Sequence, residues 1–111
     1  ISSDKIIQKI EFRVPIASSY RKFRNPASGY AMAGVFIAKF DDIVRVAITG
    51  ASPVVFRLRE LEDALSNNFT TSVLDNITID SSDFNNDIHA SSKYRGNLVK
   101  VLIEEAISDL I

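Results

Sequence analysis

Cysteine is absent from this sequence, and histidine occurs once, as His89. Without cysteine the chain forms no disulfide, ligates no iron–sulfur cluster and has no thiol nucleophile. A single imidazole is also too few for a zinc site, because such sites usually need several His or Cys ligands. The sequence therefore predicts no metal centre and no cysteine chemistry.

An excess of charge of one sign and a long hydrophobic run are also lacking. The 13 basic and 14 acidic residues give a formal net charge of −1, which exerts no general attraction on nucleic acid or an anionic membrane. The longest apolar run, Ala31 to Ala38, is far shorter than the roughly 20 residues that span a bilayer. The first residues, ISSDK, lack the charged and apolar regions of a signal peptide. We therefore expect a cytoplasmic protein with neither membrane nor nucleic acid as partner.

The residues that are present are typical of a folded domain. A length of 111 residues corresponds to a single domain, residues 1–111, with no room for a second core. Hydrophobic residues make up 46% of the chain and charged residues 24%, which argues against disorder.

The first half of the chain has the alternation of β-strands. Residues 10–14, where Ile, Phe and Val alternate with charged residues, predict a strand that the following proline ends. A second strand is predicted over Ser18 to Arg24. Ala31 to Phe40 is apolar on both faces, which is typical of a central strand. Asp41-Asp42 then turns the chain into a hairpin partner over Ile43 to Thr49.

The second half has the spacing of helices. One helix is predicted over Leu58 to Leu65, and a shorter one around Val73 to Ile77. The last helix begins after an N-cap at Ser91 or Ser92. Its apolar side is predicted to consist of Tyr94, Leu98, Leu102, Ala106 and Leu110, with Val101 and Ile107 alongside. Strands followed by helices predict an α+β fold, an antiparallel sheet of three to four strands with about three helices packed on one face.

The most suggestive chemistry lies in YRKFRNPASGY, residues 20–30. On an extended strand, Tyr20, Lys22 and Arg24 point one way while Arg21 and Phe23 point the other. The first face suits a phosphate or an electron-rich heteroaromatic ring that accepts hydrogen bonds. An edge strand protected by charges is the commoner explanation of such a pattern. Single-stranded nucleic acid is a further option, which the neutral charge and the short patch disfavour.

Other motifs fall short of a known chemistry. Ser28-Gly29 can form a turn that places Tyr30 at the start of the central strand, but the spacing is not a dinucleotide fingerprint, and no P-loop is present. The acidic loop 80–87 lacks the spacing and the glutamate of an EF-hand. A triad of His89, Ser91 and the preceding aspartate is disfavoured, because residues so close in sequence rarely converge in that way.

Three segments resemble a known family. They are YRKFRNPASGYAMAGVFIAKF (residues 20–40), VRVAITGASPVVFRLRELEDAL (44–65) and DIHASSKYRGNLVKVLIEEAI (87–107). They are similar to the flavin-binding medium subunit of the molybdenum hydroxylases, which include carbon monoxide dehydrogenase, xanthine dehydrogenase and aldehyde oxidoreductases. The matches follow the family's order and cover most of the chain. The resemblance implies the C-terminal domain of such a subunit, with the α+β fold of a carbon monoxide dehydrogenase flavoprotein.

The resemblance also implies site residues and a cofactor. In this family FAD is held mainly by preceding N-terminal domains with glycine-rich phosphate loops, which this sequence lacks. Lys22 matches the lysine of a Y-x-K strand that reaches the flavin ring. Tyr30 matches a tyrosine that covers the flavin face in the carbon monoxide dehydrogenase branch, and Tyr20 is a third candidate. The isolated domain is expected to retain no FAD.

The function implied by the resemblance is that of an oxidoreductase component. Substrate would be oxidised in a molybdopterin large subunit, and electrons would pass through an iron–sulfur small subunit to the FAD. This chain would complete the flavin pocket without a catalytic residue of its own. Two pairs, Tyr94-Arg95 and Arg57 with Glu60, are interpreted as structural. The alternative is a stand-alone interaction module of the same fold without cofactor, and a nucleic-acid-binding domain is a distant third.

Overall fold

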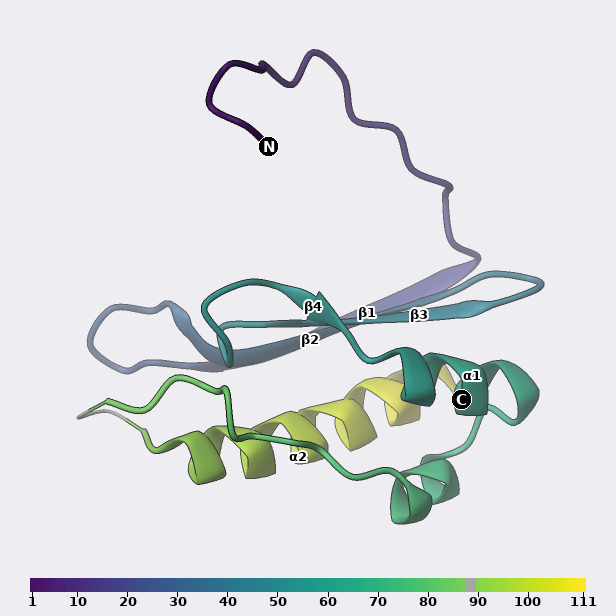
Figure 1. The fold of residues 1–111 in the computed structure, drawn as a ribbon. Coiled ribbons are helices and arrows are strands. Elements are labelled where there is room, and N and C mark those ends of the chain that lie inside the picture. The colour runs from purple at the N-terminus through teal and green to yellow at the C-terminus, as the bar shows by residue number, and fades with distance from the viewer. Residues whose placement is uncertain (88–89) are drawn as a thin grey trace.

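The structure is a computed structural model that describes residues 1–87 and 90–111. His89, the single histidine weighed above, lies outside the described residues. Figure 1 shows two layers, with the strands above and the helices below. In chain order the elements are β1 (Ala17–Arg24), β2 (Ala31–Lys39), β3 (Val44–Thr49), β4 (Phe56–Arg57), α1 (Arg59–Asn67), the 3₁₀ helix η1 (Thr71–Asn76) and α2 (Ser92–Leu110).

The four strands form one antiparallel sheet in the order β1-β2-β3-β4. The helices pack on one face of it: α2 lies under β1 and β2, and α1 lies under β3. The predicted α+β fold is therefore confirmed. The central position of β2 and its hairpin with β3 are also confirmed, whereas the two-residue strand β4 was not predicted.

The core lies between the sheet and the helices. Alternate residues of β2 and β3, among them Val35, Ile37 and Val46, are fully buried on the helix side, as a period of two requires. They meet buried residues of α2 such as Val99 and Ile103. This burial explains why apolar residues recur at every second position in the strands.

The apolar side of α2 is displaced from the predicted one. Leu98, Leu102 and Ala106 do pack on the core, but Tyr94 and Val101 are exposed. Ile107 is buried as predicted, and the buried side also includes Arg95, Gly96, Val99 and Ile103, which were not predicted there. Apolar residues occupy more than one side of this helix, so packing against β1 and β2 selects which side is buried. Ser91 is the N-cap, as predicted, since its Oγ accepts a hydrogen bond from the Tyr94 N–H at 3.1 Å.

The strand predicted at residues 10–14 is wrong. The structure has no strand there, and the chain joins the sheet only at Ile16, whose N–H donates to the Lys39 carbonyl at 2.9 Å. Before that point Arg13 is held at the β2–β3 turn, stacked 4.7 Å over the Phe40 ring and paired with Asp42 at 3.1 Å. Alternation describes side chains that suit a strand, but a strand also needs a partner for its backbone. The described residues supply none to this segment.

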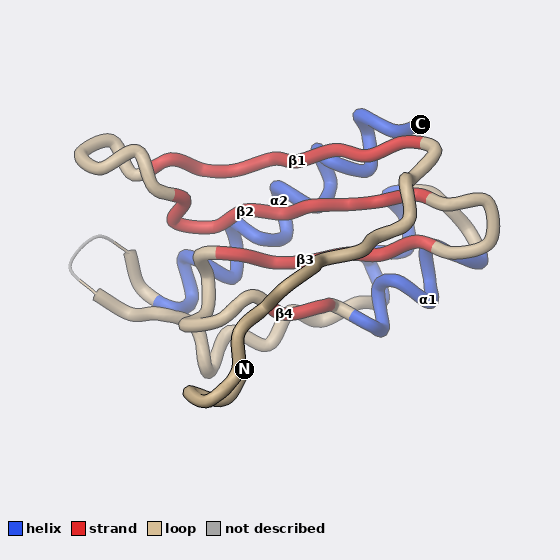
Figure 2. Tube along the Cα trace, turned by 90° about the horizontal axis from the view of Figure 1, so that it is seen from above, coloured by secondary structure: helices blue, strands red, loops and turns tan. Residues whose placement is uncertain are grey.

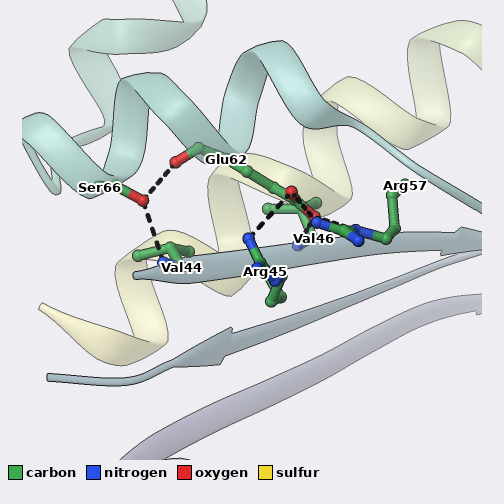
Figure 3. A network of polar contacts seen from close by, with 6 residues as sticks. All are labelled: Val44, Arg45, Val46, Arg57, Glu62 and Ser66. Carbon is green, nitrogen blue, oxygen red and sulfur yellow. Dashed lines mark hydrogen bonds and ion pairs between the residues drawn. The ribbon is translucent and has the colours of Figure 1, made fainter. Parts of the chain in front are cut away.

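Side chains of α1 complete the edge of β3 where β4 has ended (Figure 3). The Val46 N–H donates to Glu62 Oε1 at 3.0 Å, and the Val44 N–H donates to Ser66 Oγ at 3.0 Å. Arg57 donates two hydrogen bonds to the Glu62 carboxylate, at 2.9 and 2.7 Å. The predicted pairing of Arg57 with Glu60 is therefore wrong, because Glu62 and not Glu60 faces the sheet. Burial raises the pKa of the Glu62 carboxyl, but the hydrogen bonds from Arg57 and Val46 outweigh it and lower that pKa.

A second carboxylate ties the far end of α2 to β1. Arg21 donates to Asp109 through Nε at 2.7 Å and Nη2 at 2.6 Å, and Ser19 Oγ donates to the same carboxylate at 2.7 Å. The hydrogen bond from Arg21, with that from Ser19, lowers the pKa of Asp109 to about 2. Ser19 and Arg21 thus point toward the helices.

Among the described residues, no helix is both long and apolar enough to cross a membrane.

Removal of the Glu62 side chain is expected to destabilise the fold. Glu62→Ala leaves the buried Val46 N–H without an acceptor, so the free energy of unfolding should fall by about 2 kcal/mol. Glu60→Ala, in the same helical turn but exposed, should change it by less than about 0.5 kcal/mol. Urea denaturation at pH 7 measures both. Equal losses for the two variants would contradict the role given to Glu62.

The Arg21–Asp109 pair is expected to contribute to acid sensitivity. Asp109 titrates at about 2 when folded, and an unfolded aspartate titrates near about 3.9. Its stabilisation is therefore complete above pH about 4 and is lost as the pH falls toward about 2. Asp109→Asn should flatten this part of the curve of stability against pH, whereas Asp63→Asn on the exposed side of α1 should not. The urea midpoint from pH 6 downward tests this, and an unchanged slope in Asp109→Asn would contradict it.

Candidate functional site

The sheet face opposite the helices carries no helix (Figure 1) and is called the open face here. The register brings side chains of three strands together on it. Tyr20 of β1 lies opposite Phe36 of β2, and Lys22 lies opposite Gly34. Gly34 in turn lies opposite Thr49 of β3. The open face thus combines aromatic rings, a lysine and a bare glycine backbone.

The ring of Tyr20 reaches over Gly34. A Cβ built on Gly34 would come within 2.8 Å of Tyr20 Oη and 2.8 Å of Thr49 Cγ2, and within 3.2 Å of Tyr20 Cε2. The ring therefore extends from β1 across β2 toward β3, and glycine is the residue that leaves room for it. Tyr20 itself is 50% exposed.

Lys22 follows Tyr20 on the same face of β1. Within residues 1–87 and 90–111 no carboxylate pairs with its ammonium group. Arg45, the open-face cation of β3, differs because it lies 3.7 Å from the Glu62 carboxylate. Lys22 therefore offers a charge that the described chain does not neutralise, next to an aromatic ring. This agrees with the direction that strand alternation predicts for the two side chains.

Tyr30 lies at the end of the same hairpin, in the loop before β2. Gly29 has a φ of +76°, and its N–H donates to the Asn25 carbonyl at 2.8 Å. The Ser28 hydroxyl accepts a hydrogen bond from the Tyr30 N–H at 3.3 Å. These contacts form the turn that Ser28-Gly29 predicts. They leave Tyr30 80% exposed, and the structure records no contact between its ring and Tyr20 or Lys22.

Arg24, which was predicted to share a face with Tyr20 and Lys22, is the last residue of β1 and lies at an irregularity of the sheet. The register shifts between Phe23 and Arg24, because Phe23 lies opposite Ala33 but Arg24 lies opposite Ala31. The extra residue of β2 makes this an irregularity of the β-bulge kind, which re-aims nearby side chains. The Arg24 guanidinium lies against the turn, 3.4 Å from where a Cβ of Gly29 would be. The Arg24 guanidinium therefore lies at the hairpin turn, and the part of the candidate site on the paired strands consists of Tyr20 and Lys22.

The sequence did not predict that the Phe36 ring is exposed or which groups Arg95 contacts. Phe36 is exposed on the open face, although the two-sided apolar run of β2 gave no sign that one of its rings faces outward. Arg95 is buried, and its Nη1 donates to the Met32 carbonyl at 2.6 Å, while Nη2 donates to Asp87 at 3.1 Å. Arg95 thereby fixes the start of α2 to the start of β2, which supports the structural interpretation of that residue.

Comparisons with family models, with curated proteins and with solved structures find no match to this chain. Over the described residues, no group of three or more His, Cys, Asp and Glu side chains is placed to hold a metal ion.

The contact between Tyr20 and Gly34 can be tested by a double-mutant cycle. Gly34→Ala should displace the Tyr20 ring and lower stability by about 1 kcal/mol. In a Tyr20→Ala background the same change should cost less, because one of the two crowding side chains is gone. Urea denaturation of the four proteins measures the coupling. Strictly additive effects would show that the ring does not lie over Gly34.

Proposed function

We propose that this chain is the C-terminal domain of the FAD-binding medium subunit of a molybdenum-dependent oxidoreductase of the carbon monoxide dehydrogenase type. The observation that carries the proposal is that Tyr20 and Lys22 lie on the same face of β1, the open face, and that no carboxylate of the described residues neutralises Lys22. The same two residues match the family's Y-x-K strand. A sheet that the chain leaves bare on this side suits one wall of a site whose other walls lie in another domain.

The residues present fit a flavin. The half-exposed tyrosine ring on the open face offers an aromatic surface to a planar heteroaromatic group. The ammonium of Lys22 favours negative charge in its neighbourhood, and a protein tunes a bound flavin through such nearby charges. Tyr30, exposed at the end of the hairpin, is free to cover a ring that projects beyond the sheet. FAD, when bound, accepts and passes on electrons, while these side chains orient it.

The proposal assigns the remaining parts of the enzyme to other chains and domains. FAD would be held mainly by N-terminal domains of the same subunit, with glycine-rich phosphate loops. Electrons would arrive from an iron–sulfur small subunit, and substrate would be oxidised in a molybdopterin large subunit. A cytoplasmic location belongs to the same proposal. This chain would supply no catalytic group, only a wall of the flavin pocket.

A stand-alone interaction module of the same fold is the second candidate. The exposed ring of Phe36 beside Tyr20 favours it, because clustered aromatic residues are common at protein interfaces. The two candidates differ in one measurable property. Only the first requires that changes on the open face alter a bound flavin.

Lys22→Ala and Tyr30→Ala are expected to alter the flavin in the full-length subunit. Loss of the Lys22 charge should lower the flavin reduction potential by tens of millivolts, since about 30 mV corresponds to a tenfold change for two electrons. Loss of the Tyr30 ring should weaken FAD binding by up to about tenfold, the value of a stacked pair. Potentiometric titration and FAD fluorescence measure these effects.

Matched controls lie on the helix side of the molecule. Lys100→Ala and Tyr94→Ala remove an exposed lysine and a half-exposed tyrosine of α2. Both should leave the potential and the FAD affinity unchanged. Wild-type values in Lys22→Ala and Tyr30→Ala would remove these residues from the flavin site.

A further inference from the structure

The N-terminal segment, residues 6–14, has the side chains of a β-strand but none of the backbone contacts of one. Ile10, Phe12 and Val14 are 76%, 83% and 84% exposed. The residues that alternate with them are Lys9, which is ion-paired with Glu11, and Arg13. In an extended chain the apolar side chains share one side and the charged side chains the other. Such a division suits a strand with one covered and one wet face.

The backbone of this segment is also without partners. From residue 6 to residue 15 no backbone hydrogen bond reaches any other part of the described chain. A strand with a row of free N–H and C=O groups and one apolar side readily pairs with the edge of another sheet.

The direction of the segment is set by its one firm attachment. Arg13 is held by Asp42 and by the Phe40 ring at the β2–β3 turn, and Ile16 enters the sheet beside Lys39. From there the chain runs on the side of the sheet opposite the helices (Figure 1), and it crosses in front of β3 when seen from that side (Figure 2). The segment and the open face therefore border the same side of the molecule.

Pairing between the segments of two copies of this chain does not satisfy these groups. An antiparallel pair centred on Phe12 would place Glu11 opposite Arg13 and bury one ring against the other. The result, however, is a two-stranded ribbon, which is marginal in water without a third strand or a packed face. Its apolar side, with Ile10 and Val14, would stay uncovered. The partner has to bring a sheet edge with its own core.

We propose that residues 6–14 form an edge strand in the sheet of a second folded body, and that this body covers the open face. The inference rests on the proposed function, so the body is the flavin-binding part of the same subunit. The covered side of the added strand is Ile10, Phe12 and Val14, and the charged side stays in water. Because Arg13 fixes where the strand leaves this chain, docking places the second body on the side of the sheet opposite the helices, the side to which Tyr20 and Lys22 point.

Hydrogen–deuterium exchange of the full-length subunit and of the 111-residue chain tests the proposal. Amides of residues 6–14 should exchange at least about tenfold more slowly in the subunit than in the 111-residue chain. Ile10→Gln/Phe12→Gln in the subunit should abolish this protection. Lys9→Gln/Glu11→Gln, which also introduces two glutamines and leaves the net charge unchanged, should retain it. The amides of β2 and β3 serve as the internal reference for an intact fold.

The outcomes separate this inference from the proposed function. Equal exchange of residues 6–14 in subunit and chain overturns the inference, and so does equal protection in the two double variants. Protection that rises with concentration in the 111-residue chain would show pairing with a second copy instead. The segment could also be protected in a subunit whose flavin potential and FAD affinity do not change with Lys22→Ala and Tyr30→Ala. That result would support the added strand and contradict the proposed role of this chain in the flavin site. A gene that encodes no flavin-binding part with this chain would overturn both.

Discussion

Successive side chains of a strand point to opposite faces of a sheet. Helices cover one face of this sheet and leave the other bare, and the rest of the structure depends on this difference between the two faces. In β1 it sends Ser19 and Arg21 down to Asp109 on α2, with three hydrogen bonds of 2.6 to 2.7 Å. The same bonds hold Tyr20 and Lys22 facing away from the helices. One face thereby supplies stability, while the other is left free to contact something outside this chain. The charge of Lys22 and the ring of Tyr20 are thus presented by a strand whose opposite side is fixed.

The edge of β3 beyond β4 is completed by side chains rather than by a longer strand. Because β4 has only two residues, the N–H groups of Val44 and Val46 would be left without partners if Ser66 and Glu62 of α1 did not accept their hydrogen bonds. Arg95 likewise satisfies a backbone group of the sheet, because it donates a hydrogen bond from the start of α2 to the Met32 carbonyl of β2. These contacts make a firm support, so that the open face keeps its arrangement when nothing covers it.

Sequence patterns predicted the parts of this fold in which local preference and tertiary contacts agree. The two-sided apolar run located β2, alternation located β3, and the Ser91 cap located the start of α2. The same alternation was wrong at residues 10–14, because a pattern of side chains does not include the pairing partner. The irregularity in the pairing at Arg24 was not predicted, since the extra residue lies in the partner strand and leaves no mark in β1 itself. Glu60 and Glu62 are equivalent in a helical pattern, and only the position of α1 against β3 distinguishes them. The direction of Tyr20 and Lys22 followed from alternation, whereas their link to a flavin came from the resemblance.

The open face and the N-terminal segment make the same physical demand. Each presents apolar or aromatic surface that the described chain does not cover, Phe36 and Tyr20 on the sheet and Phe12 on the segment. Both lie on the side away from the helices, and Arg13 links them at the β2–β3 turn. One body that accepts the segment as a strand would cover the face in the same step. The proposed flavin site that includes Lys22 would then be assembled between two folded bodies, and its affinity for the cofactor would depend on strand docking as well as on the side chains that touch the ring.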